Sequence, residues 1–234
     1  MKYSLLLALL FFINTTTFAQ SKEEQSYNTY KFKISVPPYG LSKVKALISK
    51  IANNDESSKL SIKIYQSLNL REKFTYTMIH AEDYAQNCDI IEPVPDERKK
   101  IFAYLDEPFP EYVWSERQRL FLNSNRDSVM SLIKESVTRS GRMGLNYKEA
   151  LHAINAKEII PFIISTFKKD HKDMGLLTLL ILMMKENEYQ PFMVSESYRK
   201  LYNNDASHRT YIQYNQANED LIFSRAMGFY NKKR

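Results

Sequence analysis

The chain has 234 residues, of which 33 are Lys or Arg and 27 are Asp or Glu, and its formal net charge is +6 at pH 7. Because this mild charge is spread out, with no basic stripe interleaved with aromatic residues, we do not expect a nucleic-acid-binding protein. One cysteine cannot form an intrachain disulfide or a structural zinc site, and there is no Gly-rich loop to hold phosphates, so we expect no cofactor and no metal.

Residues 1–19 have the pattern of a cleaved signal peptide. Lys2 provides a positive start, residues 5–13 are an unbroken apolar run, and Thr17-Phe18-Ala19 offers small residues for cleavage before Gln20. The apolar run would span about 14 Å as a helix, whereas a helix that crosses a bilayer needs about 20 apolar residues. The sequence therefore predicts an exported protein, periplasmic or extracellular, that does not span the membrane.

Residues 20–40 are predicted to form an extended arm. Within them, residues 30–36 alternate between apolar and polar side chains, which is the period-two pattern of a strand. Residues 60–64 alternate in the same way, although Leu60, Ile64 and Leu68 also fit a helix. Two interpretations stay open: a small hairpin that pairs the two segments, or an extended arm that lies on the helices.

Residues 41–234 are predicted to form a single all-helical domain, because apolar residues recur there at helical spacing. Capping boxes indicate three helix starts, at Asn69 with Glu72, Ser115 with Gln118, and Asn146 with Glu149. The Pro-rich acidic stretch at 106–114 is a predicted loop and a soft domain boundary. Helices are expected near residues 41–51, 70–88, 95–105, 115–122, 129–137, 146–154, 158–167, 174–185, from 195 onward, and 217–230.

The stretch "MIHAEDYAQNCD", residues 78–89, carries the candidate catalytic residues His80 and Glu82 together with Cys88. On a helix that turns Ala81 to the core, Cys88 would be buried, and His80 and Glu82 would point about 100° to either side, too far apart to share a metal. We expect one face of an amphipathic helix with no catalytic role. The alternative hypothesis is proton transfer by His80 with Glu82 or a distant acid.

The loop at 106–114 carries the candidate binding residues Phe109, Tyr112 and Trp114. Such aromatic side chains can stack on sugars or anchor a peptide. Alternatively they fold back and cap the helical core, and Trp114 is placed to do so because it precedes the Ser115 cap, where an apolar side chain can staple onto the following helix. The acids of this loop do not have the spacing of an EF-hand calcium site.

Residues 149–185 resemble a HEAT-type helical repeat. Ala150-Leu151 and Ile154 stand where that family ends one helix, Ile160-Pro161 where it begins the next, and Asp170 in the following turn. Met174-Gly175 replaces the Val-Arg pair of the family pattern, which removes the arginine of its inter-repeat ladder. The resemblance implies stacked antiparallel helix pairs and an interaction surface, and it implies no chemistry.

Taken together, these patterns predict a mainly α fold of stacked antiparallel helix pairs, either α-solenoid-like or an irregular helical bundle, with a short N-terminal strand or extended arm. No convergent catalytic motif is present. The expected function is an exported helical interaction module that binds an envelope protein or a polymer such as a glycan, without catalysis. The alternative is an envelope hydrolase that uses acidic residues near 82–111, such as Glu82 and Glu107.

Overall fold

The structure is a computed structural model that describes residues 16–51, 58–85, 94–109 and 111–232, with residues 16–23 described by their backbone alone. Over these residues the protein is mainly helical, with two small two-stranded sheets, which confirms the predicted fold class. Among the helices of these residues, none has the length and apolar character to cross a bilayer.

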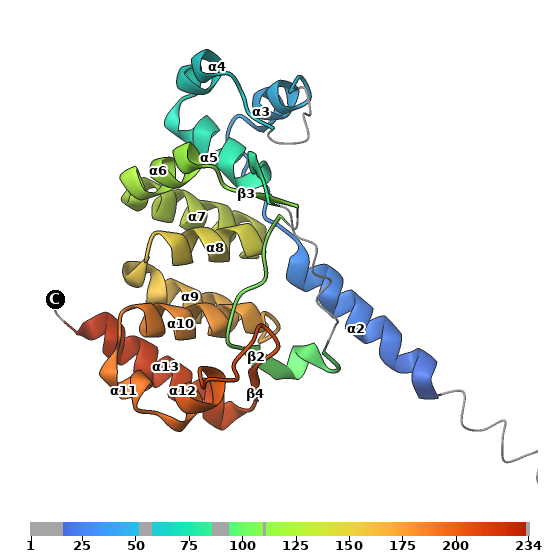
Figure 1. Cartoon of the computed structure of the whole chain (residues 1–234), viewed down its shortest axis with the longest axis vertical. Helices are drawn as coiled ribbons and strands as arrows, with labels where there is room; N and C mark the ends of the chain where they lie inside the picture. Colours follow the sequence, from blue (N-terminus) through green and yellow to red (C-terminus); the bar gives the residue numbers. More distant parts are fainter. Residues whose placement is uncertain (1–15, 52–57, 86–93, 110, 233–234) are drawn as a thin grey trace, which may run out of the picture.

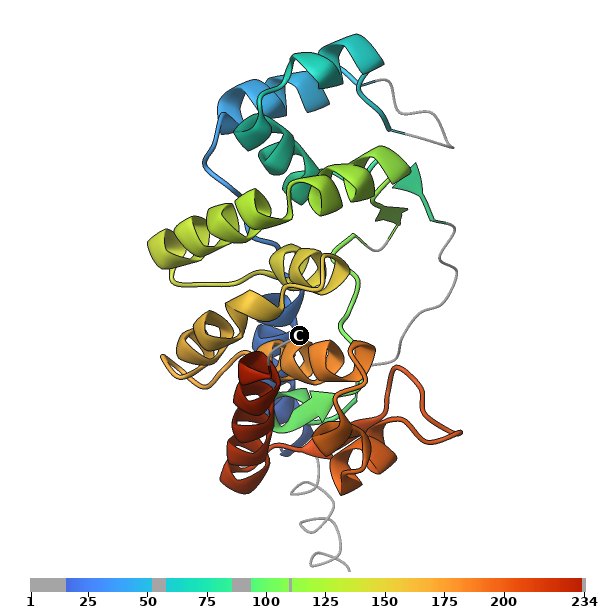
Figure 2. The same cartoon turned by 90° about the vertical axis from the view of Figure 1, so that its left-hand side faces the viewer.

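The helices form a stack along which the chain runs in sequence order, from α3–α5 at one end to α11–α13 at the other (Figures 1 and 2). The described helices are α2 (Thr16–Phe32), α3 (Leu41–Ile48), α4 (Ile62–Ser67), α5 (Leu70–Ile79), α6 (Glu116–Ser124), α7 (Arg126–Ser140), α8 (Leu145–Ala153), α9 (Ile160–Phe167), α10 (Met174–Glu186), α11 (Gln190–Met193), α12 (Glu196–Leu201) and α13 (Gln216–Asn231), with short 3₁₀ turns at η1 (Glu97–Lys99) and η2 (Lys157–Ile159).

Four short strands link parts of the chain that are distant in sequence. Strand β1 (Asp83–Tyr84) pairs antiparallel with β3 (Tyr112–Val113), and β2 (Lys100–Phe102) pairs antiparallel with β4 (Tyr211–Gln213). The β2–β4 pair lies against α10 near the α13 end of the stack, and the β1–β3 pair lies near α5 and α6 (Figure 1). The segment between β2 and β3 therefore runs along the stack from one sheet to the other.

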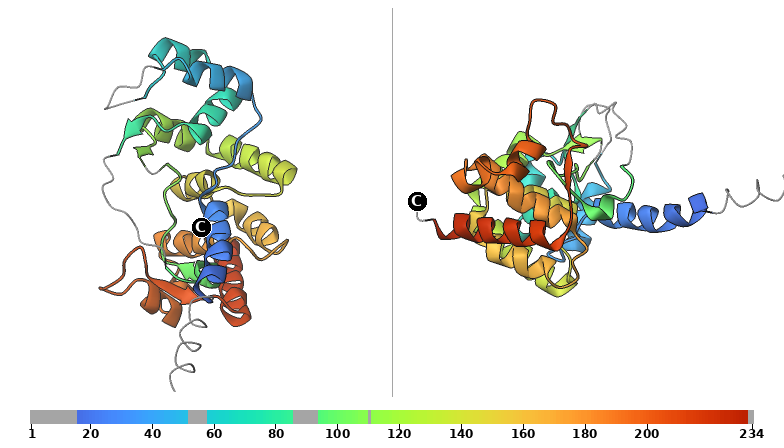
Figure 3. Two further views of the ribbon diagram at one scale, coloured as in Figure 1. Left: turned by 90° about the vertical axis from the view of Figure 1, so that its right-hand side faces the viewer. Right: turned by 90° about the horizontal axis from the view of Figure 1, so that it is seen from below.

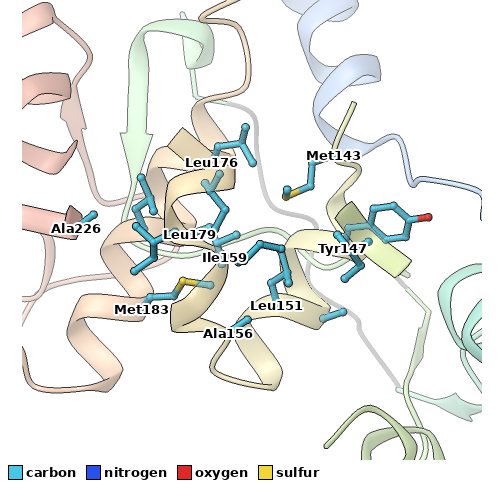
Figure 4. Packing of buried hydrophobic residues seen from close by; sticks show 14 of the residues in the cluster. Met143, Tyr147, Leu151, Ala156, Ile159, Leu176, Leu179, Met183 and Ala226 are labelled. Atoms are coloured by element: carbon cyan, nitrogen blue, oxygen red, sulfur yellow. The ribbon is translucent and has the colours of Figure 1, made fainter. Parts of the chain in front are cut away.

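The core is built around α10, which is buried on almost every side. Its residues 176–184 are all buried, because α8, α9, α13 and β2 surround it. Figure 4 shows Leu176, Leu179 and Met183 of α10 packed towards Leu151 of α8 and Ile159 of η2. A helix that is apolar all round is stable in water only when it is enclosed in this way. The same cluster extends from Phe74 on α5 to Phe229 on α13, so it includes residues on both sides of the predicted boundary at 106–114.

The N-terminal segment differs from the expected extended arm. Residues 20–32 belong to helix α2, whose C-terminal end lies at the stack and whose N-terminal end points away from it (Figures 1 and 3), and extended backbone is confined to the residues that follow it. The strand expected at 30–36, and its hairpin with 60–64, do not form. The apolar side chains of that alternating pattern are not its buried face: Phe32 is 50% exposed and Val36 is 48% exposed, whereas Ser35 is buried.

Asn146 explains why the buried face is the polar one. Its Oδ1 accepts from the backbone N–H of Ser35 (2.8 Å), and its Nδ2 donates to the carbonyls of Ser35 (2.8 Å) and Met78 (2.6 Å). The expected capping box of Asn146 with Glu149 is therefore absent, and the N-cap of α8 is Gly144, two residues earlier. A side chain that matches both backbone groups of a crossing segment holds that segment as a strand partner would.

Two further helix predictions were too long or wrong. Helix α5 ends at Ile79, and His80 is extended with φ −150° and ψ 113°, so the expected helix over 70–88 stops before His80 and Glu82. Cys88, with the rest of 86–93, lies outside the described residues. The helix expected over 95–105 is instead the turn η1 and strand β2, and the core side chains there are Ile101 in β2 and Ala103 just after it.

A substitution at Gly144 tests whether residues 34–35 pack closely against the start of α8. A Cβ at this position would lie 2.2 Å from the backbone N of Ser35 and 2.7 Å from the backbone C of Ile34, and backbone cannot swing aside. We expect Gly144→Ala to lower the free energy of unfolding by about 3 kcal/mol through overpacking. Urea unfolding followed by circular dichroism measures this loss.

Gly141→Asn is the matched control, because Gly141 has φ +73° and a Cβ added there would have nothing within 4 Å. Since Asn tolerates the left-handed region, this change should cost about 1 kcal/mol or less. Equal losses for the two variants would contradict the close contact between residues 34–35 and α8.

Candidate functional site

A pocket of ≈ 550 Å³ lies at the α3–α5 end of the stack. Its walls are the C-terminal part of α3, the residues that end and follow α5, and the loop before β3. Its volume is within the range of about 300–1,000 Å³ that small-molecule and anchor-residue sites occupy. The lining is mostly apolar, and consists of Ile48, Ser49, Ile51, Ser58, Ile79, His80, Ala81, Pro108, Phe109, Glu111 and Tyr112.

The pocket brings together three of the residues that the sequence proposed for two separate roles. His80 comes from the candidate catalytic stretch, and Phe109 and Tyr112 come from the candidate binding loop. The β1–β3 ladder joins the two segments, because Tyr84 is paired with Tyr112, with ring centroids 5.7 Å apart, and the N–H of Ala85 donates to the carbonyl of Glu111 (3.0 Å). Glu82 and Trp114, the other two candidates, do not line the pocket.

Sequence reasoning missed the isoleucine wall of the pocket and its charged residue. Ile48 and Ile51 fit the apolar stripe of a helix, and that pattern does not distinguish a side chain in the core from one that lines a cavity. In the sequence, Glu111 is one of several acids of the loop at 106–114. No local signal indicates that it would face an apolar wall contributed by residues 48–51.

Trp114 packs behind the pocket. Its Nε1 donates to the carbonyl of Thr77 (2.8 Å), and its ring lies against the main core, 6.4 Å from the ring of Phe109 in an edge-to-face arrangement. Its own carbonyl accepts from Arg119 one helical turn into α6. This geometry favours the interpretation that Trp114 caps the core and supports Phe109, which is the ring that lines the pocket.

His80 is a neutral, hydrogen-bonded wall of the pocket. Its Nε2 lies 2.6 Å from the carbonyl oxygen of Ser58, and because a carbonyl can only accept, Nε2 carries the proton. Burial lowers the pKa of the imidazole below its usual value, which keeps the ring uncharged at neutral pH. The backbone carbonyl of His80 accepts from Nε2 of Gln118 (2.7 Å), so both the ring and the backbone are held in place.

Glu82 is completely buried, with no exposed side-chain surface. Its carboxylate accepts from Nε (3.0 and 2.8 Å) and Nη2 of Arg117, from the hydroxyl of Tyr76 (2.6 Å) and from Oγ of Ser115. A carboxylate has about four lone-pair positions, and these donors occupy them. The expectation that Glu82 projects from a helix is therefore wrong, and its carboxylate has no position left for a substrate proton.

The groups around Glu82 tie four segments together. Gln118 accepts from the N–H groups of both Ser115 (3.1 Å) and Glu82 (3.2 Å), so the predicted capping box at the start of α6 also holds β1. Arg117 lies 4.3 Å from the ring centroid of Tyr65 on α4 and donates to the carbonyl of Leu60 (2.7 Å). Burial, followed by the charge of Glu82, raises the pKa of Tyr65 to about 12. This network positions the segments that form the pocket.

A second group of acids lies where the segment between β2 and β3 passes α8. Burial, and then the carboxylates of Glu107 and Asp106, raise the pKa of Glu149 to about 7, while the charge of Lys148 acts in the opposite direction. Asp106 is also bound by Lys31 (3.0 Å). Within the part of the chain that the structure describes, no group of three or more His, Cys, Asp or Glu side chains has the geometry to hold a metal ion.

Comparisons of this chain with protein-family models, with curated proteins and with solved structures gave no match. The HEAT-type resemblance of residues 149–185 thus stays a prediction. The structure shows one internal similarity in this part of the chain. Helices α8 and α10 end in the same turn, with positive φ at Asn155 (47°) and Glu188 (46°), and Pro161 and Pro191 lie in the first turns of the next helices.

Removing the Glu82 carboxylate should affect stability first. Glu82→Gln leaves the guanidinium of Arg117 without its buried partner, and breaking a buried ion pair from one side typically costs about 3–5 kcal/mol. Because Arg117 is partly exposed and can regain some hydration, we expect a loss of about 3 kcal/mol in the free energy of unfolding. Urea unfolding followed by the fluorescence of Trp114 measures it.

Glu111→Gln is the control for Glu82→Gln, since the Glu111 side chain is exposed and its loss should change stability by about 0.5 kcal/mol or less. A Glu82→Gln protein as stable as the wild type would contradict the structural role of the buried network.

The pKa of Glu149 predicts a pH dependence of stability. Because the folded state binds this proton up to about pH 7, whereas the unfolded carboxyl loses it near its usual pKa of 4.5, the contribution to stability is complete below that lower value and is lost as the pH rises through about 7. Glu149→Gln stays uncharged throughout. We therefore expect the variant to gain stability relative to the wild type between pH 5 and pH 8, by on the order of 2 kcal/mol. Urea unfolding of both proteins across this range measures the difference, and a pH-independent difference would contradict the prediction.

Proposed function

We propose that this protein is an exported helical interaction module whose pocket binds an envelope protein or polymer, without catalysis. The observation that carries the proposal is the convergence of Phe109, Tyr112 and an isoleucine wall around one pocket of ≈ 550 Å³. Aromatic rings backed by a rigid scaffold are the usual anchors for a partner side chain or a sugar face. Trp114 and the Glu82 network provide that scaffold.

Export is part of this proposal and is supported by the signal-peptide pattern of residues 1–19. Residues 1–15 lie outside the described residues, and the proposed cleavage point before Gln20 falls within α2. The described contacts that hold α2 all come after that point. Glu24 accepts from the N–H of Asp96 (2.7 Å), Tyr27 packs against the core, and Lys31 binds Glu97 (2.8 Å). Cleavage would therefore leave α2 attached to the stack.

The alternative, an envelope hydrolase that uses acids near 82–111, has one observation in its favour. Glu149, beside Asp106 and Glu107, has a pKa close to neutral, which suits an acid–base role. Against it, the carboxylate of Glu82 is enclosed, and Glu111 is the one carboxylate among the residues that line the described pocket. The geometry supports binding better than hydrolysis.

A binding assay with pocket variants tests the proposal. The mature chain, residues 20–234, is sedimented with purified envelope polysaccharide and, separately, crosslinked to envelope protein extract. We expect one of these partners to be retained, and Phe109→Ala to reduce retention about tenfold or more, as loss of an aromatic anchor does. Tyr230→Ala removes an exposed ring at the opposite end of the chain and should leave partner retention unchanged.

Retention that is equal for wild type and Phe109→Ala would overturn the proposed pocket. Release of soluble fragments from the polysaccharide by the wild type, abolished in Glu149→Gln, would overturn the proposed absence of catalysis and favour the hydrolase.

A further inference from the structure

The charges around the pocket narrow the class of partner. Glu111 is the one residue among those lining the described pocket that carries a formal charge at neutral pH, since His80 is uncharged and the other polar groups are hydroxyls. The acid lines the same pocket as the rings of Phe109 and Tyr112. A carboxylate beside aromatic faces is the environment that proteins use to hold an organic cation.

Glu111 has no ion-pair partner among the residues that the structure describes. Over residues 24–51, 58–85, 94–109 and 111–232, no lysine or arginine forms an ion pair with it; the nearby Lys59 binds Asp83 (2.6 Å) and Arg117 binds Glu82.

We infer that the pocket binds an arginine side chain of a partner protein, next to an apolar residue of the same segment. This inference rests on the proposed function and names its partner class. The guanidinium would pair with the Glu111 carboxylate and stack on an aromatic face, which arginine does better than lysine because its charge is planar and weakly hydrated. The isoleucine wall of residues 48, 51 and 79 would take the apolar neighbour and the aliphatic stem.

Short blocked peptides test this inference with the full mature chain. The probes are acetyl-Leu-Arg-Leu-amide and the same peptide with Gln or Glu in the central position, titrated against the fluorescence of Trp114, whose ring contacts Phe109. We expect the Arg peptide to bind about tenfold more tightly than the Gln peptide, and the Glu peptide to bind most weakly. The advantage of the Arg peptide should shrink as salt is raised, because the pair is partly exposed.

Variants separate the charge from the pocket. Glu111→Gln should abolish the higher affinity of the Arg peptide while leaving the affinity of the Gln peptide unchanged. Glu116 is an exposed acid on the next helix, so Glu116→Gln should leave the order of the three affinities unchanged. Equal affinity for the Arg and Gln peptides, or an advantage that survives Glu111→Gln, would overturn the inference.

Different results would contradict the binding function of the pocket and its preference for arginine. If retention of a partner depends on Phe109 but the peptides show no preference for arginine, the pocket function stands and the cationic partner is wrong. If retention of every partner is insensitive to Phe109→Ala, the proposed function itself is wrong. Retention of a neutral polysaccharide that Glu111→Gln leaves unchanged would also overturn the arginine inference.

Discussion

The buried carboxylate of Glu82 is the constraint on which the N-terminal half of the structure depends. Removing a charge from water costs several kcal/mol, and that cost is offset only when well-placed donors surround it. Here the donors come from Tyr76 on α5 and from Ser115 and Arg117 at the start of α6. Because all of them must be present at once, the helices α3–α5 can meet α6 in only one arrangement.

That arrangement also positions several of the residues that line the pocket. Gln118 holds the backbone of His80 and Glu82, the β1–β3 ladder fixes Tyr112 opposite Tyr84, and Trp114 supports Phe109 from behind. His80, Phe109 and Tyr112 are therefore positioned by neighbours that do not themselves line the pocket. A site that is already ordered loses little conformational entropy on binding, so more of the contact energy contributes to affinity.

The segment between β2 and β3 connects this end of the molecule to the helical core. It leaves the β2–β4 pair beside α10, passes the Glu149 carboxyl at Asp106 and Glu107, and ends in the aromatic residues of the pocket. The ionisation of Glu149 therefore acts on the same segment that carries Phe109. The enclosed helix α10 supplies the fixed base against which this segment is placed.

The sequence alone predicted what short-range physics decides: the apolar helices α9 and α10, the capping box of Asn69 with Glu72 and that of Ser115 with Gln118, and the mainly helical fold. It did not predict the end of α5 at Ile79, because Glu82 leaves the helix and pairs with Arg117, which is 35 residues away in the sequence. It also did not predict α8's true start, since Asn146 binds the backbone of Ser35 instead of capping its own helix. The pocket, too, depends on contacts between residues that are distant in sequence. Its walls come from α3 and the residues just after it, from the end of α5 and from the loop before β3, and only a tertiary network of buried hydrogen bonds decides which side chains from such separate segments face one another.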